Sequence, residues 1–176
     1  DDKRAPVIMI HGGCWLSAFD ISHSIAQANG LAHAGHAVYS IEYRRSGETG
    51  GGWPVTFADV MLGITTIIEA LPESTTTVNL IGHSAGGHLA LLAAGDIQRH
   101  LALLGRSELT LNIVGVAAIV DIKQYALGQN SCQAVTSDFM AGMPDEKVGD
   151  YYLANPNNLA LTDKALAQIT LLHGDA

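Results

Sequence analysis

One short turn constrains the fold of this chain more than any other feature. Residues 82–86 read Gly-His-Ser-Ala-Gly; they follow a buried-type apolar run at 78–81 and open an apolar helical pattern. A Gly-x-Ser-x-Gly turn between a strand and a helix is so tight that the serine backbone is strained, and Gly82 and Gly86 let the two elements pass without a clash. We therefore expect the Ser84 hydroxyl above the carboxyl end of a sheet. The alternative is a glycine-rich turn with an incidental serine.

The apolar segments of the chain predict an α/β fold. Helical patterns separate the expected strands, which gives strand–helix–strand order and a mostly parallel, doubly wound sheet. The runs do not alternate with polar residues, which is typical of strands buried on both faces. The 176 residues suit one domain, 1–176. The expected strands are 7–10, 37–41, 78–81, 113–120 and 169–172.

Three helices are expected between these strands. The clearest covers 57–71, with apolar residues at helical spacing, Thr56 and Asp59 as an N-terminal cap and Pro72 as the stop. A second should run over 85–94 and end at Gly95. A third covers 24–34. Residues 125–166 are less regular, with a short helix at 144–152 and a turn at 155–158.

Composition narrows the classes of partner. Hydrophobic residues make up 48% of the chain and charged residues 15%, which is enough for a large core and too apolar for a disordered chain. The net charge of -8 argues against nucleic acid and anionic membrane surfaces. No apolar run approaches the roughly 20 residues of a membrane span, and no leader-like segment opens the chain. We expect a cytoplasmic protein with neither kind of partner.

The two cysteines, Cys14 and Cys132, are few for a chain of this length. We expect two free thiols in a reducing compartment. No CxxC or Cys/His spacing suggests a metal site, so no metal is expected.

The first strand runs into residues 11–15, His-Gly-Gly-Cys-Trp. Glycines let a backbone approach a substrate carbonyl closely, and amides there can hold the negative charge that develops on its oxygen. We assign these donors to the backbone amides of Gly13 and Cys14, together with that of Ala85 at a helix N-terminus. Cys14 as a nucleophile is the weaker alternative, because no base is placed for it. Trp15 belongs either to the core or to a wall of the acyl pocket.

Several segments resemble the α/β-hydrolase superfamily, in particular the branch of bacterial kynurenine formamidases and related small carboxylesterases. The resemblance covers nearly the whole chain. It implies cofactor-free hydrolysis of a small ester or N-formyl amide. It also implies a loop-tethering role for His11. The segments are 11–15, 42–45 (Glu-Tyr-Arg-Arg), 50–54 (Gly-Gly-Gly-Trp-Pro) with 59–60, 82–90 and 172–174 (Leu-His-Gly).

Five further side chains near these segments are candidates for a functional or a structural role. Trp53 and His83 are candidates for the substrate pocket, although Trp53 fits core packing equally well. Glu42 and Arg44, at the end of a strand, are expected to form a structural salt bridge. Neither His83 nor His88 is expected to be the base, since one occupies the turn and the other lies on the helix behind it.

A serine hydrolase also needs an acid and a base, which in α/β-hydrolases follow in the order Ser, Asp or Glu, His. The resemblance places the acid just after a strand ending in His-Gly-x-x-Asp, and the chain ends at 173–176, His-Gly-Asp-Ala. Asp175 could serve as the acid if the loop shifted. Asp121 is a second candidate, with a turn residue as its alternative. We therefore expect a hydrolase core that is truncated at both ends, or one of two chains that share a fold, with sheet edges that favour a homo-oligomer.

The sequence thus predicts a serine hydrolase that cleaves a small carboxylic ester or N-formyl amide through an acyl-enzyme on Ser84. The alternative is a catalytically incomplete module that binds a small ligand or a partner chain. A third hypothesis is a peptidase of the same superfamily.

Overall fold

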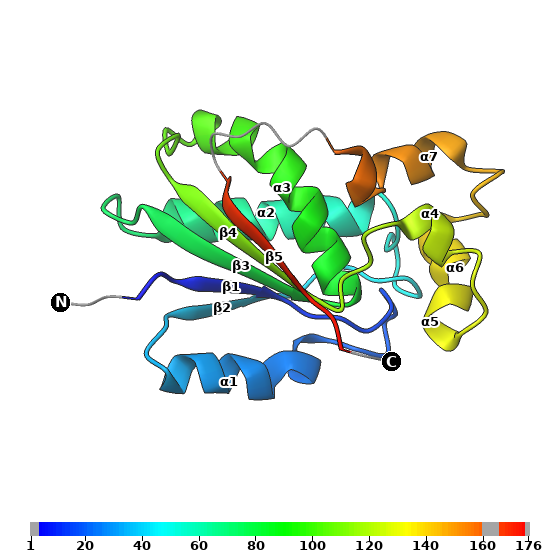
Figure 1. Ribbon diagram of the computed structural model, residues 1–176, viewed down its shortest axis with the longest axis horizontal. Helices are drawn as coiled ribbons and strands as arrows, with labels where there is room; N and C mark the ends of the chain where they lie inside the picture. Colours follow the sequence, from blue (N-terminus) through cyan, green and yellow to red (C-terminus); the bar gives the residue numbers. More distant parts are fainter. Residues whose placement is uncertain (1–3, 160–165, 175–176) are drawn as a thin grey trace.

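The computed structural model describes residues 4–159 and 166–174. Its centre is a single sheet of five parallel strands in the order β2-β1-β3-β4-β5 (Figure 1). This confirms the predicted α/β class with a parallel, doubly wound sheet. The strands are β1 (Val7–Ile10), β2 (Val38–Ile41), β3 (Thr77–His83), β4 (Thr110–Val116) and β5 (Leu166–Leu172).

Helices cover both faces of the sheet, as expected of a doubly wound fold. Helix α1 (Ile25–His33), which follows the 3-10 turn η1 (Ile21–Ser24), lies on one face; α2 (Val55–Ala70) and α3 (Ala85–Leu103) lie on the other (Figure 1). A chain of short elements follows β4 and gathers near the carboxyl ends of the strands (Figure 1). These are α4 (Ile122–Tyr125), α5 (Ser131–Ala134), α6 (Thr136–Met140), α7 (Val148–Leu153) and η2 (Pro156–Asn158).

The hydrophobic core lies between the sheet and the α2–α3 face. All four residues of β1 are buried, as predicted for a strand covered on both sides. Strands β3 and β4 instead alternate between buried and partly exposed residues, which the apolar runs did not predict. The cause is the thin cover on the other face, because α1 contributes no buried residue. On β3 and β4 this face carries a side-chain hydrogen bond between Asn112 and Asn79, 3.0 Å long.

Three predicted element boundaries are wrong. Gly95 does not end α3, which continues to Leu103; an added Cβ at Gly95 would lie 2.8 Å from the Leu159 side chain, so the glycine allows close packing. Thr56 does not cap α2, because the helix begins at Val55 with Pro54 at the N-cap position; the Thr56 hydroxyl donates to the Arg44 carbonyl at 2.6 Å. Strand β4 ends at Val116, before Ala117 with φ of 47°.

Among the helices of the described residues, none is long and apolar enough to cross a membrane.

Candidate active site

The turn between β3 and α3 holds Ser84 in a strained conformation. Its φ of 52° and ψ of -117° lie where non-glycine residues are rare. The Ser84 amide donates to the Val116 carbonyl of β4 at 2.8 Å, which fixes the turn to the sheet. An added Cβ at Gly82 would lie 2.2 Å from the Gly86 carbonyl oxygen, and one at Gly86 would lie 2.2 Å from that of Ile10. The geometry is therefore the tight strand-to-helix turn that the sequence predicts.

The loop after β1 packs directly against this turn. A Cβ at Gly12 would lie 2.7 Å from the His83 carbonyl oxygen and 3.4 Å from the Ser84 Cβ. The next three residues, Gly13, Cys14 and Trp15, all have positive φ, at 110°, 54° and 58°. Within the described ranges, the backbone amides of Gly13 and Cys14 donate to no other group of the chain.

A polar network holds this loop to the segment after β2. His11 is buried, and its Nε2 donates to Glu42 Oε1 at 3.0 Å. The Tyr43 ring stacks on the His11 ring with centroids 4.3 Å apart, and its hydroxyl donates to the His11 carbonyl at 2.8 Å. Arg45 donates to the Phe19 carbonyl at 2.6 Å and forms a salt bridge of 3.2 Å with Glu42. These contacts agree with the tethering role expected of His11.

The sequence did not predict individual roles for Tyr43 and Arg45. The only signal for them is the Glu-Tyr-Arg-Arg segment itself. Arg44, expected in a structural salt bridge beside Glu42, pairs instead with Asp59 at 2.7 Å, while Glu42 pairs with His11 and Arg45.

The three pocket candidates lie in different surroundings. Trp15 is fully buried and stacks on Phe139 of α6, with ring centroids 4.6 Å apart. Trp53 is half-buried, stacks on Phe57, and donates its amide to the Phe139 carbonyl at 2.8 Å. Both tryptophans thus contact Phe139 of α6, Trp15 through its ring and Trp53 through its backbone amide.

His83 is exposed and lines a cavity of about 260 Å³ together with Gly12, His23 and Val116. Partial burial, and secondarily the nearby His23, lower the pKa of His83. The structure therefore brings His83, but neither tryptophan, to the lining of a cavity beside the Gly12 loop.

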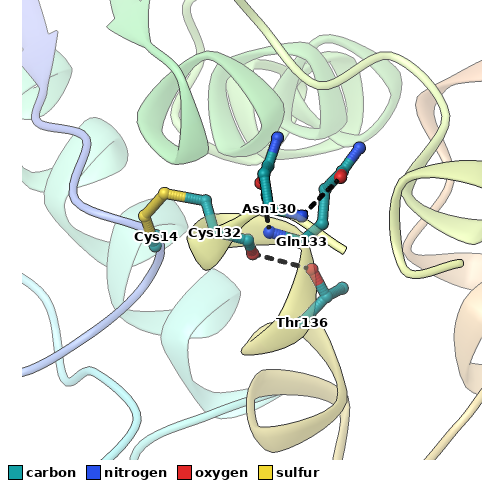
Figure 2. The surroundings of a disulfide bond; sticks show 5 residues. All are labelled: Cys14, Asn130, Cys132, Gln133 and Thr136. Atoms are coloured by element: carbon teal, nitrogen blue, oxygen red, sulfur yellow. Dashed lines mark hydrogen bonds between the residues drawn. A yellow bond between two sulfur atoms is a disulfide. The ribbon is translucent and has the colours of Figure 1, made fainter. Parts of the chain in front are cut away.

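The prediction of two free thiols is wrong. Cys14 and Cys132 form a disulfide with a Cα–Cα distance of 5.2 Å, across a separation of 118 residues (Figure 2). Figure 2 shows the bond joining the loop after β1 to the helix α5. The two cysteines come together only through the tertiary fold, so their spacing in the sequence does not predict a disulfide.

The acid candidates have separate outcomes. The Asp121 carboxylate accepts hydrogen bonds of 3.0 Å from the Gln124 amide and from the Asn155 side chain, so it acts as the N-terminal cap of α4. This is the turn role given above as its alternative. Asp175 lies outside the described residues. His173, at the end of β5, lines a cavity of about 470 Å³ that Asp121 also lines.

His88 lies on α3 with no solvent exposure, as expected of a residue behind the turn. Its Nε2 donates to the Ala154 carbonyl at 2.7 Å, which ties α3 to the end of α7. Burial lowers the pKa of His88 to about 4. The neutral ring therefore packs in the core, and within the described residues its Nδ1 has no hydrogen-bond partner.

This burial predicts a pH-dependent stability. The unfolded chain binds a proton at His88 below pH 6.5 and the folded chain only below about 4, so stability falls as pH drops through that window. Between pH 7 and pH 5 we expect a loss of about 2 kcal/mol from this residue. Urea unfolding at both pH values measures it. His88→Gln, which keeps a donor for Ala154, should flatten the dependence by that amount; an unchanged slope would rule the assignment out.

Among the residues that the structure describes, no cluster of three His, Cys, Asp or Glu side chains could hold a metal ion.

The chain is similar to a known protein family and to solved structures with the α/β-hydrolase fold, which agrees with the predicted fold. The BD-FAE family model matches residues 1–176. No curated protein matches the chain by sequence. Among solved structures, the chain is similar to esterase B from Lactobacillus rhamnosis HN001, with a TM-score of 0.74 and 21% identity over 97% of this chain and 56% of that one.

Two further structures have the same fold. A truncated carbohydrate esterase from gut microbiota has a TM-score of 0.71 and 23% identity, over 98% of this chain and 67% of its own. Carboxyl esterase 2 from the mycorrhizal fungus Tuber melanosporum has a TM-score of 0.65 and 18% identity, over 97% and 59%. The chain thus spans little more than half the length of esterase B. Because the family model matches its whole length, the chain belongs to the BD-FAE family.

Proposed function

We propose that this chain forms the nucleophile-bearing core of a serine esterase that hydrolyses small carboxylic esters. The observation that carries the proposal is the placement of Ser84 at a positive-φ turn, with the Gly12–Cys14 loop packed against it. A strained serine at a strand-to-helix turn, next to unpaired backbone amides, is the arrangement that acyl transfer needs.

In the proposed mechanism Ser84 Oγ attacks the ester carbonyl. The amides of Gly13, Cys14 and Ala85 hold the negative charge of the tetrahedral intermediate, Ala85 with the added field of the 19-residue helix α3. The alcohol leaves, and water then hydrolyses the acyl-enzyme. No cofactor takes part.

The base and the acid come, in this proposal, from residues outside 1–176 or from a second chain. His88 is unsuited as the base because it is buried and bonded to Ala154. Asp121 is unsuited as the acid because it caps α4. The chain's coverage of 56% of esterase B is compatible with a contribution from a further segment.

The proposed substrate is an ester rather than an amide because the similar structures named above are esterases. An N-formyl amide is the second candidate, and it rests on the resemblance of the Glu-Tyr-Arg-Arg and Gly-Gly-Trp-Pro segments to the kynurenine formamidase branch. A cytoplasmic location remains a prediction, against which the disulfide favours an oxidising compartment.

Covalent labelling tests the proposal. The full-length protein is incubated with a fluorophosphonate, and peptide mass mapping should place the label on Ser84. Turnover of p-nitrophenyl acetate, p-nitrophenyl butyrate, N-formylkynurenine and a dipeptide then separates esterase, formamidase and peptidase. Absence of both label and turnover would favour the non-catalytic binding module instead.

A further inference from the structure

The disulfide occupies a position that the proposed mechanism does not use but that borders it directly. One of its half-buried cysteines, Cys14, lies in the loop whose amides are the proposed oxyanion donors. The other, Cys132, lies on α5, far along the chain (Figure 2). The bond therefore fastens the donor loop to a different part of the molecule.

The backbone conformation of this loop is one that a covalent link would stabilise. Three successive residues, Gly13 to Trp15, adopt positive φ. For Cys14 and Trp15, which have a side chain, this backbone conformation is energetically unfavourable. Within the loop, the Leu16 amide donates to the Gly13 carbonyl at 2.9 Å. A conformation of this kind persists only when its surroundings enforce it.

The far end of the link is well anchored. Asn130 and Gln133 form a capping box on α5, and the Thr136 hydroxyl donates to the Cys132 carbonyl at 3.2 Å (Figure 2). Helix α6 follows at once, and its Phe139 stacks on Trp15. In addition to the network at His11, the loop is thus held covalently at Cys14, and at Trp15 by stacking and by a 2.8 Å hydrogen bond from the Ser46 amide.

We infer that the Cys14–Cys132 disulfide is a positioning element for the oxyanion loop, so that hydrolysis depends on its oxidised state. The oxidised bond holds the amides of Gly13 and Cys14 beside Ser84. Reduction leaves Cys14 without its covalent anchor and lets the strained loop relax. This inference rests on the proposed serine esterase function.

The redox step balances with a dithiol reductant. One thiolate of the reductant attacks a cysteine sulfur and breaks the S–S bond, which forms a mixed disulfide. The second thiol of the reductant then attacks the reductant's own sulfur in this mixed disulfide and releases the cysteine that was bound to it. The products are the Cys14 and Cys132 thiols and a cyclic disulfide of the reductant, so two electrons and two protons pass from the dithiol to the protein.

Kinetics of the full-length protein before and after treatment with dithiothreitol test the inference. Because oxyanion donors act mainly in the transition state, reduction should lower kcat toward p-nitrophenyl acetate by about tenfold or more and change KM by less than about threefold. Reoxidation with diamide should restore kcat. Cys132→Ser should show the low kcat and no response to dithiothreitol, while Ser131→Ala, on the same helix, should behave like the wild type.

Hydrogen exchange of residues 11–20 provides a readout that does not require activity, and it should increase on reduction while far-UV circular dichroism stays constant. An unchanged kcat in the reduced protein, or unchanged exchange, would overturn the inference. Free Cys132 in a non-reducing peptide map would do so too. Failure of the proposed function is distinguishable, because Ser84→Ala would then match the oxidised wild type.

Discussion

Replacing Ser84 with alanine is expected to lower the kcat of the full-length protein toward p-nitrophenyl acetate by about 10⁶-fold. The hydroxyl is the proposed nucleophile, and no acyl-enzyme can form without it. The residual rate should come from the oxyanion donors and substrate binding alone. Alanine removes one oxygen atom from a half-exposed side chain, so the fold should persist.

The matched control is Ser107→Ala, because Ser107 is exposed on the loop before β4 and far from the turn in sequence. Its kcat should equal that of the wild type. Unfolding midpoints of both variants show whether lost activity reflects lost structure. If Ser84→Ala kept more than a tenth of the wild-type activity, the assignment of the nucleophile would be wrong.

Replacing Gly86 with alanine should destabilise the protein by at least about 3 kcal/mol. The new Cβ would lie 2.2 Å from the Ile10 carbonyl oxygen and 2.4 Å from that of His11. Both are backbone atoms at the end of β1, so α3 or the first strand must move. Either movement also displaces the Gly12 loop from Ser84, and activity should fall with stability.

Gly30→Ala is the control for this change. Gly30 lies in the exposed part of α1, and an added Cβ there would meet no atom within 4 Å. Alanine should therefore raise stability by up to about 1 kcal/mol, through the higher helix propensity. Urea unfolding of the two variants measures the difference. A Gly86→Ala protein within 1 kcal/mol of the wild type would contradict the steric argument.

The parts of the site that sequence predicts well are those with local causes. Residues 82–86 must accommodate a strand and a helix in a few residues, and this requirement dictates small side chains at fixed spacing. The bounds of β1 are likewise predictable from a short apolar run, whereas the tether at His11 follows from the family resemblance. Local rules suffice where the steric demand lies within one turn of chain.

The features that the sequence did not predict depend on contacts between distant segments of the chain. Thr56 has the pattern of a helix cap, but the tertiary fold offers its hydroxyl the Arg44 carbonyl instead. Gly95 has the pattern of a helix end, but α3 needs it for the approach of Leu159. The pairing of Cys14 with Cys132 depends on how residues 121–158 return to the sheet, which no periodicity encodes.

Helix α6 has a consequence for attempts to exchange parts of this protein. Its Phe139 ring supports Trp15 from the first strand's loop, and its Phe139 carbonyl receives the amide of Trp53 from the loop before α2. One residue therefore sets the spacing of two loops that belong to different strands. A chimera that imports the whole stretch between β4 and β5 from a relative must bring an aromatic ring and a free carbonyl to the same place, or both loops lose their common support.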